Sequence, residues 1–219
     1  MKTILSDING TTSPAAIAKD FMADFLANGE AYLSRAEPKA LAIYESIKRE
    51  TGLDSPKEVL TFIKAELEKR NFKPDYLSLA GFVNVDGYHN GRLRTEVYPD
   101  VPVAFRDWKK NGKGVYTYSN GCGALQEQLF KTSTQGDLTG LIDGYFDSVE
   151  IGDKNSPDSY KRISDSIQVA PSDIMFLSDL EKELEAADKA GCQVRQVIRP
   201  GNKPVESDLY KRITSFAQV

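Results

Sequence analysis

Residues 1–12 read MKTILSDINGTT, a short apolar run that ends on Asp7 and turns at once through Asn9 and Gly10. An apolar run of this length before turn-forming residues is typical of a buried parallel strand. In open sheets built from alternating strands and helices, ligands bind beyond the carboxyl ends of the strands. Asp7 is therefore a candidate nucleophile at such an edge.

The composition is that of an ordinary soluble globular protein. Of the 219 residues, 40% are hydrophobic and 27% are charged, and the chain is long enough to bury a substantial core. The net charge is −4 and no basic stripe is present, which argues against nucleic acid or an anionic membrane as a partner. Without a leader pattern or an apolar run long enough to cross a bilayer, the expected compartment is the cytoplasm.

Cysteine and histidine offer little chemistry. Cys122 and Cys192 lie far apart, in no metal-ligand spacing, so we expect reduced thiols. His89 is the only histidine and lies in a turn-like segment, residues 87–91. A catalytic triad would depend on it entirely, so we expect a surface histidine instead.

From Pro14 to about residue 79 the hydrophobic period is helical, with breaks at prolines and at Gly52 that predict roughly four helices. Residues 81–91 are rich in glycine and favour a return connection. Because the first strand has to join a sheet further along the chain, this helical block is an insertion. An insertion at the ligand-binding edge commonly serves as a lid or specificity cap.

From about Tyr98 strands and helices alternate, which predicts a parallel sheet covered by helices on both faces. The expected strands are 2–6, 114–118, 174–177 and 193–198, and the expected helices are 124–131, 159–168 and 181–189. The fold class is therefore α/β: a Rossmann-like core with a parallel sheet flanked by helices, plus a helical cap after the first strand. We expect the core in residues 1–13 and 96–219 and the cap in residues 14–95.

Four polar points follow expected strands, and together they fit phosphoryl transfer to a carboxylate. Asp7 would attack phosphorus, because a carboxylate is an adequate nucleophile and the acyl phosphate hydrolyses afterwards. Ser119 and Asn120 would bind phosphoryl oxygens. Lys154 would hold positive charge beside the phosphate and keep Asp7 ionised. Asp179 would join Asp7 in an oxygen-only site suited to Mg²⁺.

Each point also has an ordinary structural explanation. Asp7 and the residues after it could form a simple turn, and Ser119-Asn120 a simple loop. Lys154 could be a solvated lysine, and Asp179 part of a helix N-cap. Four such coincidences in the right order are less plausible than one site.

The same residues resemble the four motifs of the haloacid dehalogenase (HAD) superfamily. The motifs are Asp7-x-Asn9-Gly10-Thr11-Thr12, Tyr118-Ser119-Asn120-Gly121, Lys154 and Ser178-Asp179-x-x-x-Glu183. The chain is further similar to enolase-phosphatases, also called acireductone synthases, of methionine salvage. That similarity covers residues 1–12 and 96–202 and is thin in the helical insertion, where it is limited mainly to Lys19-Asp20 and Gly87-Tyr88.

The resemblance implies that the protein enolises and then dephosphorylates 2,3-diketo-5-methylthiopentyl-1-phosphate with Mg²⁺, generally as a monomer. It assigns the site by motif. The catalytic residues are Asp7, the nucleophile, with Asn9 and Lys154. The metal ligands are Asp7, the carbonyl of Asn9 and Asp179. The phosphate-binding residues are Ser119, Asn120 and Lys154, and Thr11 and Glu183 support the site.

Two residues depart from the family pattern. Asn9 occupies a position that is ordinarily acidic, and an amide can neither donate a carboxyl proton nor accept one from water. Because losing a general acid or base costs a factor of about 10² to 10⁴, we expect phospho-Asp7 to form and to be released slowly. Asn84 stands where the family usually has tryptophan, so the preference for the carbon skeleton is expected to differ.

The sequence thus predicts a cytoplasmic, Mg²⁺-dependent phosphomonoester hydrolase of enolase-phosphatase type, acting on a small-molecule phosphoester. One alternative is a catalytically impaired relative that keeps the pocket and acts as a binding or regulatory protein. Another is a HAD phosphatase for a different small phosphoester. The presence of all four motif residues favours an enzyme: Asp7, Ser119, Lys154 and Asp179. Asn9 favours the binding protein.

Overall fold

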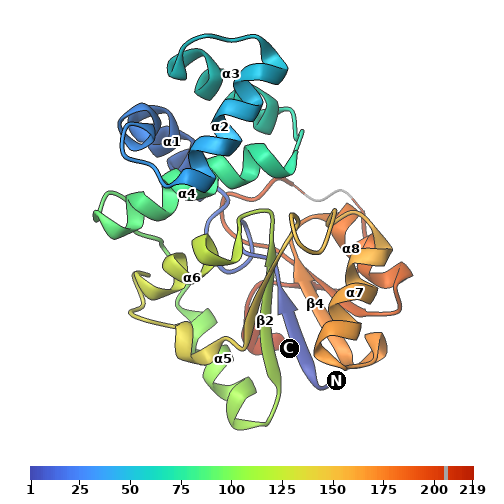
Figure 1. Ribbon diagram of the computed structural model, residues 1–219. Coiled ribbons are helices and arrows are strands. Elements are labelled where there is room, and N and C mark those ends of the chain that lie inside the picture. Colours follow the sequence, from blue (N-terminus) through green and yellow to red (C-terminus); the bar gives the residue numbers. More distant parts are fainter. Residues whose placement is uncertain (205–206) are drawn as a thin grey trace.

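The computed structural model describes residues 1–204 and 207–219 and has two parts, a parallel sheet with flanking helices and a group of helices above one end of it (Figure 1). The described strands form one six-stranded sheet in the order β3-β2-β1-β4-β5-β6, and every neighbouring pair is parallel. Their bounds are β1 Thr3–Ser6, β2 Gly114–Ser119, β3 Gly144–Asp147, β4 Ile174–Ser178, β5 Gln193–Val197 and β6 Arg212–Ile213. The predicted α/β fold class is confirmed.

Helices cover both faces of this sheet. In Figure 1, α5 and α6 lie on one side of the strands and α7 and α8 on the other. Their bounds are α5 Asp100–Lys110, α6 Gly123–Lys131, α7 Pro157–Ile167 and α8 Glu181–Lys189, with short 3₁₀ turns at Thr139–Leu141, Pro171–Asp173 and Phe216–Gln218. No helix in the described ranges is both long and apolar enough to span a membrane.

The central strand is buried on both faces. Ile4 of β1 packs in a cluster with Phe105 and Phe130 from the α5 and α6 side, whereas its neighbour Leu5 packs with Tyr160 and Leu184 from α7 and α8. Successive side chains of a strand point to opposite faces, so a strand covered on both sides buries consecutive apolar residues. This is why Ile4 and Leu5 are adjacent instead of alternating with polar residues.

Four helices lie between β1 and α5: α1 Ile17–Leu33, α2 Pro38–Thr51, α3 Pro56–Glu68 and α4 Pro74–His89. We call residues 17–89 the cap. Proline begins three of these helices, and Gly52 ends α2 in the left-handed conformation, with φ of 70°. The cap has its own buried cluster, which includes Phe25, Ile63 and Val83. The expectation of about four helices is confirmed.

The predicted return connection over residues 81–91 is wrong, because α4 continues through Gly81 and Gly87 to His89. Both glycines are sites of close packing. A Cβ on Gly81 would lie 3.0 Å from Sγ of Cys122, and one on Gly87 would lie 2.5 Å from Oδ2 of Asp24. The glycines therefore let α4 approach its neighbours rather than end the helix. His89 is exposed, as expected.

Candidate active site

A pocket of about 550 Å³ lies between the cap and the carboxyl ends of the strands. Six residues of the predicted site line it: Asp7, Asn9, Ser119, Asn120, Lys154 and Glu183. Asp179 and Thr11 are not part of its wall. Asp179 instead lies beside the turn that follows β1, where a Cβ on Gly10 would come within 2.6 Å of its Oδ2. The fold thus brings most of the predicted residues to one place.

The buried ammonium of Lys154 joins two carboxylates. Its Nζ donates to Oδ1 of Asp7 and lies 2.9 Å from Oε2 of Glu183, and only 3% of Lys154 is exposed. Glu183 also accepts a hydrogen bond of 2.8 Å from the hydroxyl of Ser178. Lys154 is therefore not a solvated lysine. Its hydrogen bond holds the Asp7 carboxylate in one orientation, facing the pocket.

Lys154 does not follow a strand directly, which corrects the expected placement. β3 ends at Asp147, and the chain then crosses a loop before α7 begins at Pro157. Two tyrosine hydroxyls fasten this loop: Tyr118 donates to the carbonyl of Gly152 (2.7 Å), and Tyr160 donates to the carbonyl of Lys154 (2.8 Å). The loop, rather than the strand end, carries the lysine inward.

The electrostatics of the cluster follow from burial and from its charges. Burial alone would lower the pKa of Lys154, but the negative charges of Asp7 and Glu183 outweigh it, so the net shift is upward and the ammonium is retained. Burial raises the pKa of Asp179 to about 7, and the charges of Asp7 and Glu183 add to the effect. Burial likewise raises the pKa of Glu183, against the opposing effect of Lys154. The site holds more carboxylates than one lysine neutralises.

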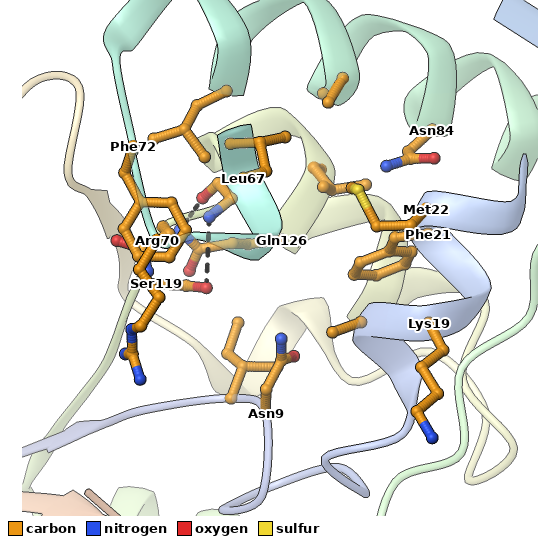
Figure 2. Close-up of a pocket in the computed structure, with 18 of the residues that line it drawn as sticks. Asn9, Lys19, Phe21, Met22, Leu67, Arg70, Phe72, Asn84, Ser119 and Gln126 are labelled. Atoms are coloured by element: carbon orange, nitrogen blue, oxygen red, sulfur yellow. Dashed lines mark hydrogen bonds between the residues drawn. The ribbon is translucent and has the colours of Figure 1, made fainter. Parts of the chain in front are cut away.

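The loop after β2 is anchored by a buried glutamine that the sequence analysis missed. Gln126 of α6 donates from Nε2 to the carbonyls of Gly121 (2.7 Å) and Phe146 (2.8 Å), and its Oε1 accepts a hydrogen bond of 2.5 Å from Thr117. The hydroxyl of Ser119 accepts a hydrogen bond of 3.3 Å from the amide of Gly121 (Figure 2). These contacts hold the loop open toward the pocket. A glutamine at the start of a helix carries no sequence signal for this role.

The turn after Asp7 is tight. Gly10 has φ of 82°, a conformation that side chains disfavour, and a Cβ there would collide with Asp179. The Gly10 amide donates to the carbonyl of Ser13 (2.7 Å), and Nδ2 of Asn202 donates to the carbonyl of Gly10 (2.9 Å). Asn9 is half-buried and projects into the pocket from this turn (Figure 2).

A second missed residue, Arg199, supports the same turn. Its guanidinium donates from Nε to the carbonyl of Thr11 (3.0 Å) and pairs with Asp100 at 3.0 Å. It lies between two rings, 4.5 Å from the centroid of Tyr98 and 4.9 Å from that of Phe216. The hydroxyl of Thr11 itself is buried without a hydrogen-bond partner in the described part of the chain. An arginine after a strand is common in any sequence, so only the tertiary contacts identify it.

The residues beside Asp7 fit a divalent cation if a main-chain carbonyl serves as one of the ligands. In residues 1–204 and 207–219 no three His, Cys, Asp or Glu side chains converge as a metal cluster, and Glu183 is already held by Lys154 and Ser178. However, Oδ1 of Asp179 is buried and has no partner within those ranges. With Asp7 and the main-chain carbonyl of Asn9, Asp179 would complete an oxygen-only set of the kind that Mg²⁺ prefers.

Residues 1–191 match the haloacid dehalogenase-like hydrolase family. The chain belongs to this family. Among its relatives, the Enolase-phosphatase E1 of Picosynechococcus is 36% identical, with 99% of this chain and 96% of the relative covered. The Enolase-phosphatase E1 of Danio rerio is 33% identical, with 100% and 94% covered.

A solved structure supports the same relationship. The UTR4 protein of Saccharomyces cerevisiae superimposes with a TM-score of 0.78 at 29% sequence identity, and the match covers 100% of this chain and 99% of that one. The resemblance seen in the sequence motifs is therefore confirmed: this HAD-like hydrolase is an enzyme with enolase-phosphatase relatives along its whole length, and it is a phosphatase.

Proposed function

We propose that this phosphatase enolises and dephosphorylates 2,3-diketo-5-methylthiopentyl-1-phosphate in methionine salvage, through a phospho-aspartate on Asp7. The observation that carries the proposal is the Asp7 carboxylate, held by buried Lys154 at the end of the central strand and facing a pocket between core and cap. The similarity to proteins named enolase-phosphatase, at 36% identity over nearly all of both chains, supports the choice of substrate.

In the proposed reaction a carboxylate oxygen of Asp7 attacks phosphorus, the bond between phosphorus and the ester oxygen breaks, and the enol product leaves. Water then attacks phosphorus, which frees inorganic phosphate and regenerates Asp7. Lys154 holds the attacking carboxylate and faces the charge that develops on the phosphoryl group. The Ser119 hydroxyl and the Asn120 amide bind phosphoryl oxygens.

We propose Mg²⁺ as the metal, held by Asp7, the carbonyl of Asn9 and Asp179, with Thr11 and Glu183 supporting the ligands. When bound, it would neutralise negative charge on the transferring phosphoryl group. The unpartnered Oδ1 of Asp179 and the excess of carboxylates over cations around Lys154 support this assignment.

We further propose that the cap and its two connections, residues 14–95, form one domain on a core of residues 1–13 and 96–219, of which 205–206 lie outside the described residues. The separate hydrophobic cluster of the cap supports this division. The enzyme is proposed to work in the cytoplasm as a monomer on a small-molecule phosphoester. The interspersed charge, without a basic stripe, supports the exclusion of nucleic acid and membrane partners.

Asn9 favours a slow second half of the reaction. Its amide cannot take a proton from the attacking water, so hydrolysis of phospho-Asp7 is expected to be about 10²- to 10⁴-fold slower than with an acidic residue at this position. The second candidate function follows from the same residue: a phosphoester-binding protein with little turnover.

One experiment separates these possibilities. Release of the organic product, a phenol or an enol, and of phosphate is followed with Mg²⁺ on an aryl phosphate and on the methylthio diketo substrate, for the protein and for Asn9→Glu and Asn9→Asp. We expect a burst of organic product equal to the enzyme concentration, followed by slow phosphate release, and faster release in both variants.

Repeated turnover by the unaltered protein, with phosphate released as fast as the organic product, contradicts the slow hydrolysis of phospho-Asp7. The substrate that is hydrolysed faster then identifies the specificity. A burst without turnover favours the binding protein. Neither burst nor turnover in any of the three proteins rejects the phosphatase mechanism for these substrates.

A further inference from the structure

The buried part of the cap side of the pocket is apolar except for one amide. Its apolar wall includes Phe21, Met22, Leu67 and Phe72. Of the cap residues that line the pocket, all within the described ranges, Asn84 is the one polar residue that is buried, with 1% exposed. The charged residues of that wall are instead at least partly exposed. A polar group in such surroundings normally has a hydrogen-bond partner.

The Asn84 side chain has no such partner in the described part of the protein. Its Oδ1 is buried and has no hydrogen-bond partner there, although Asn84 lies in the middle of α4. Figure 2 shows Asn84 at the cap side of the pocket beside Met22, with Asn9 at the opposite side. Which end of the carboxamide carries oxygen is set by its hydrogen bonds, so the group offers a ligand both a donor and an acceptor.

A ligand held at both sides of the pocket would span it. Its phosphate would lie at the core side with Asp7, Ser119 and Lys154, and its carbon skeleton would extend toward Asn84. An entirely apolar skeleton would leave the carboxamide unpaired in a drier pocket, which is unfavourable. An oxygen on the skeleton would satisfy it.

We propose that Asn84 is a specificity residue whose carboxamide hydrogen-bonds a carbonyl or hydroxyl oxygen of the substrate skeleton, so that the pocket selects oxygenated phosphoesters over plain alkyl ones. The inference rests on the phosphoester pocket of the proposed function. It adds the side chain that recognises the carbon skeleton of the substrate. The apolar side chains around it accommodate the remainder of the chain.

The test measures binding, so it does not depend on turnover. Hexylphosphonate, whose first methylene replaces the ester oxygen, is compared by calorimetry with its 3-oxo and 4-oxo derivatives in the presence of Mg²⁺. We expect the unaltered protein to bind one oxo compound about 10- to 100-fold tighter than hexylphosphonate. In Asn84→Leu, which is similar in size, that preference should fall to about threefold or less.

Two further variants keep the result interpretable. Asn84→Ala should lose the preference in the same way, even if leucine fits poorly. Met22→Leu alters the neighbouring pocket wall without changing its polarity, and it should keep the preference. Because Asn84→Leu removes an unpaired buried amide, its unliganded form should also unfold at an equal or higher temperature than the unaltered protein.

Equal binding of oxo and plain phosphonates by a protein that still hydrolyses an aryl phosphate overturns this inference alone. A preference that persists in both Asn84 variants overturns it as well. A protein that binds neither the phosphonates nor inorganic phosphate overturns both this inference and the proposed function.

Discussion

The two sides of the pocket are built differently. At the core side, charged groups are tied to one another and to the backbone: Lys154 joins Asp7 and Glu183, and Ser178 holds Glu183 in turn. At the cap side, charged residues are at least partly exposed, and the buried wall is apolar except for Asn84, whose Oδ1 has no partner within the described residues. The Lys154 cluster is thus paired within the protein, whereas the Asn84 carboxamide oxygen is not. This difference suggests that the sheet edge sets the reaction and the cap sets the substrate.

The largest effect should come from removing the nucleophile at the core side. Asp7→Asn is nearly isosteric but cannot form the acyl phosphate, so phosphate release should fall by about 10⁴-fold or more. Phosphate release and phosphonate binding are both measured, and the preference for oxo compounds should survive because Asn84 is unchanged. A variant within tenfold of the original rate would exclude Asp7 as nucleophile.

The next largest effect should come from breaking the buried ion pairs of Lys154 at the core side. Lys154→Met leaves Asp7 and Glu183 buried without their cation, and we expect a loss of about 3–5 kcal/mol in the free energy of unfolding. Denaturant titration measures it, with Lys161→Met on the exposed face of α7 as control. Adding Glu183→Gln should recover part of the loss. A Lys154 variant as stable as the control would contradict the buried ion cluster.

A smaller effect should follow from loosening the turn after β1. Arg199→Met removes the hydrogen bond to the Thr11 carbonyl and the pairing with Asp100, so we expect about 2–4 kcal/mol lower stability and a several-fold lower kcat. Arg199→Lys should be intermediate, because an ammonium cannot reproduce the planar contacts between two rings. Arg106→Met, at an exposed position of α5, is the control. Loss of stability with unchanged kcat would make Arg199 structural only.

The smallest effect tests whether the cap is stabilised independently of the site. In the cap, the hydrogen bond from Arg35 lowers the pKa of Asp86 to about 2, from an ordinary value of 3.8, and Arg92 contributes. A depressed folded-state pKa means that the stabilisation is present above pH 4 and is lost as the pH falls toward 2.

We therefore expect Asp86→Asn to lower Tm by about 1–3 °C at pH 7, with a difference that shrinks below pH 4. Hydrolysis of an aryl phosphate should change less than twofold at pH 7. Thermal melts from pH 7 to pH 3, with Asp158→Asn on α7 as a surface control, measure the difference. A penalty that grows on acidification would contradict the assigned direction.

Sequence patterns predicted the parts of the molecule in which local order and tertiary environment agree. The strand before Asp7 carries Ile4 and Leu5 at successive positions because helices cover both faces of the sheet, so its burial is visible in the residues themselves. The alternation after residue 98 and the helical period before residue 79 likewise follow from repeating contacts. The motif residues Asp7, Ser119 and Asn120 reach the pocket because parallel strands end at one edge.

The predictions failed where a short sequence pattern is compatible with two different structures. Gly81 and Gly87 predict a break, yet in α4 they serve close packing against Cys122 and Asp24. Lys154 was expected at a strand end, but it lies in a loop fastened by two tyrosines. Short-range patterns cannot distinguish these cases, because the deciding contact comes from a residue distant in the chain.

The sequence by itself therefore determined the α/β fold class, the helical insertion and the hydrolase family, since each depends on period, order and motif. Only the tertiary structure decided that Lys154 is buried between two carboxylates, that Gln126 and Arg199 hold the loops of the site, and that Asn84 lies unpaired in the pocket. Burial and hydrogen-bond partners depend on the path of the whole chain, and an amide, a lysine or an arginine looks the same in the sequence whether it is solvated or enclosed.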